Sequence, residues 1–269
     1  MKKTTIIISS LIILAGVIFY SCTKENSINN TQNKPIINNN KGGDGIERLF
    51  DKDYIQELKN ISGIDPQELS KSKTFIDYYN NLQAVNECFR TKFLTLLQTN
   101  NTQAEYFKTL LQNANNSFIN GDTINGLNTV NQVYTEIGCL SQIGFNYNNS
   151  NYNIPLFIDE LRLANKSYSL LLDVYPNLNK IDEKYKIDIL TIAIYWYSEG
   201  NDSKTVGPSC SSIYNAACAH AFLEACGCAA AAAQLVWPPA VVVAEIACTS
   251  FYVYTLCEAY NNYKRCIGQ

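Results

Sequence analysis

The sequence predicts an all-α protein in which a bundle of about six helices is followed by a disulfide-stapled helical hairpin module. Two observations predict this class. Between residues 46 and 200, apolar side chains recur every three or four positions, as they do along a helix with one buried face. Between residues 210 and 269, seven of the ten cysteines gather in a segment almost without charge. Cysteines at such density in a secreted chain indicate disulfides.

The helices of the bundle follow from this periodicity and from local start and stop signals. They are expected over residues 46–59, 66–98, 104–118, 124–140, 154–175 and 181–198. The second helix has Asp65 as its N-cap and Pro66 at its first position. The last one, residues 181–198, is apolar on two sides, so we expect it to be buried on two sides near the centre of the bundle.

A change of composition predicts the domain boundary. Residues 201–209 are polar and include Gly207 and Pro208, so we expect a linker between the bundle, residues 46–200, and a separate module, residues 210–269. Within that module, Pro238 and Pro239 follow Trp237 and divide the segment into two helical arms.

Folding the two arms back on each other brings their cysteines together in nested order. The expected pairs are Cys210 with Cys266, Cys218 with Cys257, and either Cys226 or Cys228 with Cys248. Nine residues turn a helix by about half a revolution, so Cys257 should face away from Cys248 and Cys266 unless the arm bends. Sequence alone does not fix the connectivity.

Two further cysteines lie in the bundle. Cys88 and Cys139 each flank a residue of an apolar stripe, and a bridge between them would close a loop of about 50 residues. The alternative is that one of them is a buried small hydrophobic residue, or that it pairs with the odd cysteine of the C-terminal module. Outside Cys22, nine cysteines remain, so at least one has no partner within the fold.

Metal and catalytic chemistry find little support. Cys218, His220, Cys226 and Cys228 offer four possible ligands within eleven residues, but residues two apart on a helix point away from each other, so we expect no metal. His220 is the single histidine, and the sequence holds no nucleophile elbow, phosphate loop or zinc-protease motif. We expect no cofactor and no enzymatic activity. A net charge of −3 and a pI near 5.3 argue against nucleic acid as a partner.

The N-terminal residues have the layout of a signal peptide. Lys2 and Lys3 precede an apolar run, residues 6–20, that is too short to span a membrane, and Ser21 then precedes Cys22. A small residue before a cysteine at this point resembles the lipobox of bacterial lipoproteins, here of the Bacteroidota type. The resemblance implies that residues 1–21 are removed and that Cys22 is lipidated. It places the protein at the outer membrane, on the periplasmic face or the cell surface. The Asn-rich residues 22–45 are expected to form a tether.

The module carries a second resemblance. The order Cys226-Gly227-Cys228, an alanine-rich arm, Pro239-Ala240-Val241, then Cys248, Cys257 and Cys266 resembles the halocin class of cysteine-rich bacteriocin peptides. Precursors of that class join a neutralising helical domain to a C-terminal peptide. The resemblance implies that residues 46–200 would shield the module, which would be cut free near Gly207.

Three weaker features concern partners and modification. The uncharged residues 225–244 are long enough for a membrane span, but Pro238 and Pro239 interrupt them, and packing on the bundle is the alternative. Thr123 follows Asp122 in a short motif that resembles the O-glycosylation site of Bacteroidota secreted proteins. Residues 146–153, rich in Tyr and Asn, form an expected loop that could contact a glycan or a protein.

The sequence thus favours a non-enzymatic outer-envelope lipoprotein that binds a partner or surface through its C-terminal module. The anchor at Cys22 makes the membrane one partner, and a protein, a glycan or a target membrane is the other. The alternative is a bacteriocin-like precursor with a membrane-active C-terminal peptide.

Overall fold

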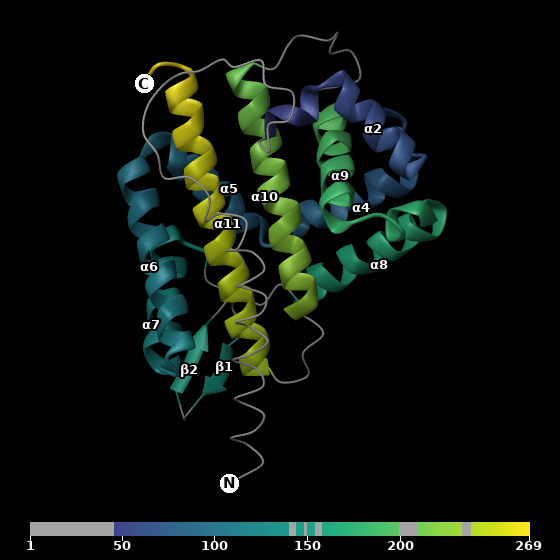
Figure 1. Cartoon of the computed structure of the whole chain (residues 1–269). Coiled ribbons are helices and arrows are strands. Elements are labelled where there is room, and N and C mark those ends of the chain that lie inside the picture. The colour runs from purple at the N-terminus through teal and green to yellow at the C-terminus, as the bar shows by residue number, and fades with distance from the viewer. Residues whose placement is uncertain (1–45, 140–143, 148–149, 154–157, 199–208, 233–237) are drawn as a thin grey trace. The chain divides into compact units, whose positions relative to one another are not determined.

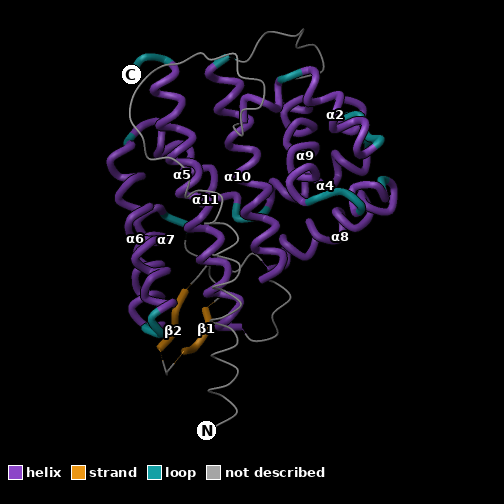
Figure 2. Tube along the Cα trace, in the orientation of Figure 1, coloured by secondary structure: helices purple, strands orange, loops and turns teal. Residues whose placement is uncertain are grey.

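The computed structural model describes residues 46–139, 144–147, 150–153, 158–198, 209–232 and 238–269 (Figure 1). The expected lipidation site Cys22, the expected tether and the expected linker at residues 201–209, apart from Ser209, lie outside the described residues. The all-α class is confirmed, and the helices are coloured purple in Figure 2. Their bounds are η1 Ile46–Phe50, α2 Lys52–Ser62, α3 Pro66–Leu69, α4 Lys73–Ala84, α5 Glu87–Thr99, α6 Asn101–Ile119, α7 Thr123–Ile137, α8 Ile158–Val174, η2 Pro176–Asn179, α9 Glu183–Ser198, α10 Cys210–Ala232 and α11 Pro238–Cys266.

The single helix expected over residues 66–98 is in fact three helices, α3, α4 and α5. Asp65 caps the first as expected, since its side chain accepts a hydrogen bond from the Gln67 N–H. Ser72 starts the second by accepting from the Phe75 N–H at 3.2 Å. Asn86, in the left-handed region at φ 48°, separates the second from the third. Apolar periodicity carries across such breaks, because each new helix resumes a buried face, so the pattern alone concealed them.

A short β-hairpin interrupts the helices where only a loop was expected. Strand β1 (Gly144–Tyr147) pairs antiparallel with β2 (Ser150–Asn153), with Phe145 opposite Tyr152. Four residues a strand is too little for an alternating pattern to stand out among Asn and Tyr residues.

Helix α9 occupies the central position expected for it. Its residues from Asp188 to Ile194 are buried without interruption, and α9 packs against α3 and α10. A charged side chain on a helix that is buried on all sides needs a hydrogen-bonding or ionic partner. Asp188 lies in the buried part of α9 and therefore must have such a partner.

The cysteine-rich segment forms the expected pair of helical arms, but it is not a separate module. Helices α10 and α11 run side by side (Figure 1), and they also pack against α9 and α6, respectively. Phe222 and Leu256 belong to the same hydrophobic core as Phe93 in α5, and the Ser250 hydroxyl donates to the Leu111 carbonyl of α6 at 3.1 Å. Residues from Asp44 to Gln269 form one compact unit. The change in composition therefore does not mark a domain boundary. It marks helices α10 and α11, which are apolar on most sides and are covered by the bundle.

The second arm begins where the prolines predict. Helix α11 starts at Pro238, with Pro238 and Pro239 in the first turn, where no intrahelical hydrogen bond is lost. Within the described parts of the chain, no helix combines the length and the apolar character needed to span a bilayer.

Candidate functional site

Three disulfides hold the described fold. Cys210 joins Cys266 with Cα atoms 5.8 Å apart, and Cys228 joins Cys248 at 5.7 Å, so the outer and inner staples of the hairpin form as expected. Of the two candidates for Cys248, the partner is Cys228. Together the staples fix the two ends of α10 against α11.

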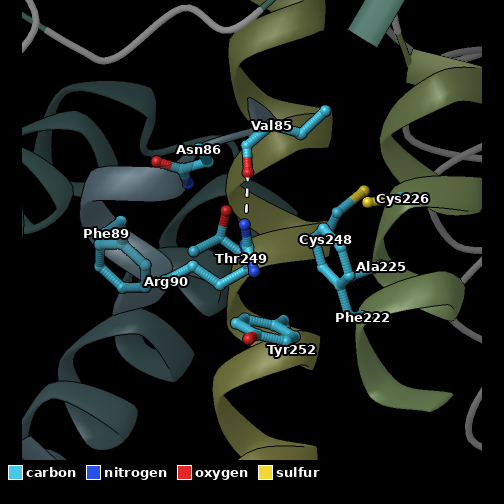
Figure 3. Close-up of a pocket in the computed structure, with 10 residues that line it drawn as sticks. All are labelled: Val85, Asn86, Phe89, Arg90, Phe222, Ala225, Cys226, Cys248, Thr249 and Tyr252. Carbon is cyan, nitrogen blue, oxygen red and sulfur yellow. Dashed lines mark hydrogen bonds between the residues drawn. The ribbon is translucent and has the colours of Figure 1, made fainter. Parts of the chain in front are cut away.

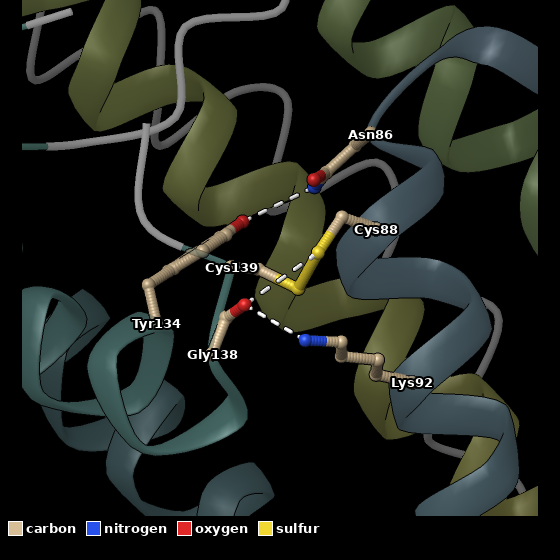
Figure 4. The surroundings of a disulfide bond; sticks show 6 residues. All are labelled: Asn86, Cys88, Lys92, Tyr134, Gly138 and Cys139. Carbon is tan, nitrogen blue, oxygen red and sulfur yellow. Dashed lines mark hydrogen bonds between the residues drawn. A yellow bond between two sulfur atoms is a disulfide. The ribbon is translucent and has the colours of Figure 1, made fainter. Parts of the chain in front are cut away.

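The bundle disulfide joins Cys88 to Cys139, also at 5.8 Å, and confirms the bridge between the two bundle cysteines. Figure 4 shows polar contacts on both sides of it. The Lys92 ammonium donates to the Gly138 carbonyl at 2.8 Å, and the Asn86 amide donates to the Tyr134 hydroxyl at 3.1 Å. The start of α5 is thereby tied to the end of α7.

The expected pair Cys218–Cys257 is wrong, because both residues carry free thiols, as does Cys226. The half-turn offset along α11 is the reason: Cys257 lies near Glu105 and Lys108 of α6, whereas Cys218 lies near Tyr214 on α10.

Burial raises the pKa of the three free thiols, at Cys218, Cys226 and Cys257, to about 12. At neutral pH they are protonated, which makes them poor nucleophiles and poor metal ligands. Cys228, one of the four candidate metal ligands, is consumed by its disulfide. Among the described residues, no group of His, Cys, Asp or Glu is arranged to hold a metal ion.

His220 takes part in a buried polar network that the sequence did not reveal. The network centres on Asp188, whose side chain is 0% exposed. Asp188 accepts hydrogen bonds from the Arg48 guanidinium at 2.9 and 3.0 Å and from the Tyr54 hydroxyl at 2.6 Å. His220 lies on its other side, with Nε2 at 3.8 Å from Asp188 and Nδ1 at 3.4 Å from Glu224.

This network joins η1, α2, α9 and α10 at the centre of the unit. Burial, followed by the hydrogen bond to Asp188, raises the pKa of the Tyr54 hydroxyl, so Tyr54 donates and stays neutral. The one signal in the sequence was Asp188, which lies between the apolar residues Ile187 and Ile189 in the doubly apolar helix 181–198. An acid at such a position needs a partner, but sequence does not say which of the remote cations supplies it.

The hollow that best fits a ligand is a cleft of ≈ 330 Å³ between α10 and the bundle. Its walls come from α4, α5, α9, α10 and α11. Four tyrosines line it, namely Tyr79, Tyr195, Tyr214 and Tyr252. The volume lies at the lower end of the range of small-molecule sites, and aromatic walls with a few polar groups are typical of them.

Two polar side chains that line this cleft, Tyr214 and Arg90, differ from the others in their hydrogen bonding. Tyr214 is 9% exposed, and its hydroxyl makes no hydrogen bond of good geometry among the described residues, although Cys218 and Gln98 lie close to it. Burial, and then the neighbouring Cys218 thiol, raises the pKa of Tyr214. Arg90 donates to the side-chain and backbone oxygens of Gln83 and to the Val85 carbonyl, all neutral acceptors.

A second, smaller cavity lies beside Arg90 (Figure 3). It measures ≈ 40 Å³ and is lined mostly by apolar groups, with Val85 and Phe89 on one side and Cys226 and Cys248 on the other. It has room for no more than a few water molecules. The Arg90 guanidinium lies 4.2 Å from the ring centroid of Phe222, which borders both cavities.

The candidate modification residue Thr123 is the first residue of α7. Asp122 before it is the N-cap, and it accepts a hydrogen bond from the Asn125 N–H at 3.2 Å. The short motif therefore has a structural role, and glycosylation at Thr123 stays a prediction. Of the expected contact loop, residues 146–153, the described residues 146–147 and 150–153 belong to strands β1 and β2.

Comparison with known proteins gave no relative: no family model matches the chain, and neither does any curated protein or solved structure.

Proposed function

We propose that this protein is a non-enzymatic lipoprotein of the outer envelope that binds a partner through its cysteine-rich C-terminal hairpin. The signal-peptide pattern supplies the anchor at Cys22. The observation that carries the binding function is the cleft of ≈ 330 Å³ where α10 meets the bundle. The hairpin and the bundle together, rather than the hairpin alone, form this site.

The disulfides support a binding role. The staples Cys210–Cys266 and Cys228–Cys248 hold α10 against α11, and α10 supplies one wall of the cleft. A wall fixed before the ligand arrives loses little conformational entropy on binding, which raises affinity.

The binding function is tested by filling the cleft. Ala219 lines it on α10, whereas Ser211 is exposed on the same helix outside its lining. The full chain is immobilised and screened against envelope glycans and peptides. Ala219→Trp should abolish binding of any retained partner, and Ser211→Trp should leave it intact. Equal binding by both variants would remove the cleft from the proposal.

The anchor has its own test. Cells fed a radiolabelled fatty acid should label the wild-type protein, and Cys22→Ala should abolish the label. Outer-membrane fractionation and protease treatment of whole cells then locate the protein. Recovery of unlabelled wild-type protein in the soluble fraction would overturn the lipoprotein assignment.

A bacteriocin-like precursor is the second candidate, and one observation favours it. Helices α10 and α11 are covered by α6 and α9, as a shielded peptide would be. Release of a fragment starting near Gly207, and leakage of lipid vesicles by that oxidised fragment, would support this function. An intact chain on cells, together with inactivity on vesicles, would exclude it.

A further inference from the structure

The cleft between α5 and α10 has polar groups at its two ends and apolar groups between them. On α5, Arg90, Leu94 and Gln98 line it at intervals of four residues, so they share one face. Facing them on α10, Tyr214, Cys218 and Phe222 line it at the same interval. These two rows of residues form two facing walls of the cleft, and a ligand would lie between them.

The contacts set the direction in which these two faces run. At one end, the Arg90 guanidinium lies over the Phe222 ring at 4.2 Å. At the other end, Gln98 and Tyr214 both line the cleft, and their side chains lie close together. Eight residues separate the two ends on each helix, which corresponds to about 12 Å at 1.5 Å a residue.

The Arg90 end calls for a negative charge. A guanidinium has five N–H donors, and three hydrogen bonds to neutral oxygens leave donors available. No described carboxylate forms an ion pair with Arg90, and none of the residues that line the cleft is Asp or Glu. A partly buried guanidinium without an anionic partner fits a carboxylate of a ligand.

The Tyr214 end calls for a neutral polar group. Tyr214 lines the cleft, and its buried hydroxyl makes no hydrogen bond of good geometry among the described residues, although the Cys218 thiol and the Gln98 side chain lie close to it. A buried polar atom in this state is satisfied by water or by a ligand atom. Between the two ends, Leu94 on α5 and Ala219 on α10 line the cleft, so the part of the ligand that lies along these two helices should be apolar.

We propose that the cleft binds an elongated organic acid. Its carboxylate pairs with Arg90, its apolar body lies along Leu94 and Ala219, and a polar group at its far end hydrogen-bonds to the Tyr214 hydroxyl. This inference rests on the proposed binding function and specifies the ligand class of the same site.

The experiment uses the full chain in lipid nanodiscs and three soluble probes, 10-hydroxydecanoate, decanoate and 1,10-decanediol, with equilibrium dialysis as the readout. The wild type should bind 10-hydroxydecanoate saturably at one site, and the uncharged diol at least tenfold more weakly, because it lacks the charge-assisted hydrogen bonds. Nanodiscs without protein correct for partition into lipid.

Two variants assign the two ends. Tyr214→Phe should weaken 10-hydroxydecanoate several-fold and leave decanoate unchanged, since decanoate has no far-end group. Arg90→Gln should weaken both acids at least tenfold and leave the diol unchanged. The matched control Arg265→Gln, at an exposed site near the end of α11, should change nothing. If Arg90→Gln does not fold, Arg90→Lys replaces it as the test variant. Because lysine keeps the positive charge, Arg90→Lys should still bind the two acids more tightly than the diol.

Equal binding of acid and diol by the wild type, or acid binding that both variants leave unchanged, would overturn the ligand class. No binding of any probe would also overturn it. The proposed binding function has a separate readout: partners retained by the wild type and lost in Ala219→Trp would sustain it even if all three probes fail.

Discussion

Asp188 in α9 accepts two hydrogen bonds from Arg48, a residue 140 positions away in η1. The carboxylate is fully buried, whereas 16% of the Arg48 side chain remains exposed. The pair therefore holds the first described residues against the central helix, and Tyr54 and His220 enclose the same carboxylate.

Breaking this pair should be costly. Arg48→Met leaves the buried Asp188 carboxylate without its main partner, and we expect a loss of about 3 kcal/mol in the free energy of unfolding. The double variant Arg48→Met/Asp188→Leu removes both charges and should be more stable than the single variant. Urea unfolding followed by circular dichroism measures both. A single variant as stable as the wild type would show that the pair adds nothing.

The parts of the fold that follow from local chemistry were predictable. The Asp65 cap, the start of α11 at Pro238 and the burial of α9 each depend on residues close in sequence. The partner of Asp188 was not predictable, because Arg48 is brought to it only by tertiary packing.

The same distinction explains the cysteines. The nested order of the cysteines correctly predicted the pair Cys210–Cys266, and it limited the partner of Cys248 to Cys226 or Cys228. It failed for Cys257, because the helical rotation along α11 places Cys257 next to α6 and away from Cys218. The cleft could not be predicted from the sequence, because its walls come from five helices that only tertiary packing brings together.

The two staples of the hairpin should differ in their contribution to stability. Cys210 and Cys266 are 56 residues apart, and Cys228 and Cys248 are 20 apart. The chain-entropy model gives about 4 kcal/mol for the longer loop and about 3 kcal/mol for the shorter one. Paired Cys→Ser variants, unfolded in urea without reductant, measure the two losses. A larger loss for the shorter loop would contradict the entropic explanation, and a Cys218–Cys257 peptide in a non-reducing digest would contradict the connectivity.

The free thiols should be unreactive in the folded protein. Burial raises the pKa of Cys218, Cys226 and Cys257 to about 12, so almost no thiolate exists at pH 8. Iodoacetamide should modify them slowly in buffer and rapidly in urea, as followed by intact mass. Fast modification of Cys226 in the folded state would show that it is accessible.

The same shift has a consequence for stability at high pH. Above pH 9 the unfolded chain loses these thiol protons while the folded chain keeps them, so the unfolded state binds fewer protons and stability falls as pH rises toward 12. Cys226→Ala should flatten this decline relative to the wild type. An identical pH profile for both proteins would refute the contribution of Cys226.

Two helical glycines should respond in opposite ways to alanine. A Cβ on Gly126 in α7 would lie 2.4 Å from the Phe118 ring, whereas a Cβ on Gly227 in α10 would have no atom within 4 Å. Alanine normally stabilises a helix interior by about 0.5–1 kcal/mol relative to glycine. Gly227→Ala should therefore gain stability by about that amount.

At Gly126 the close approach outweighs this gain. Phe118 is buried at 7% exposure, so its ring can move only by disturbing the packing of α6 against α7. Forcing a methyl group into such a contact costs about 1–3 kcal/mol. Gly126→Ala should lower the free energy of unfolding, and Gly126→Ala/Phe118→Leu should recover part of the loss by making room for the methyl group. If Gly126→Ala and Gly227→Ala stabilise equally in urea unfolding, the contact between α6 and α7 is looser than the structure shows.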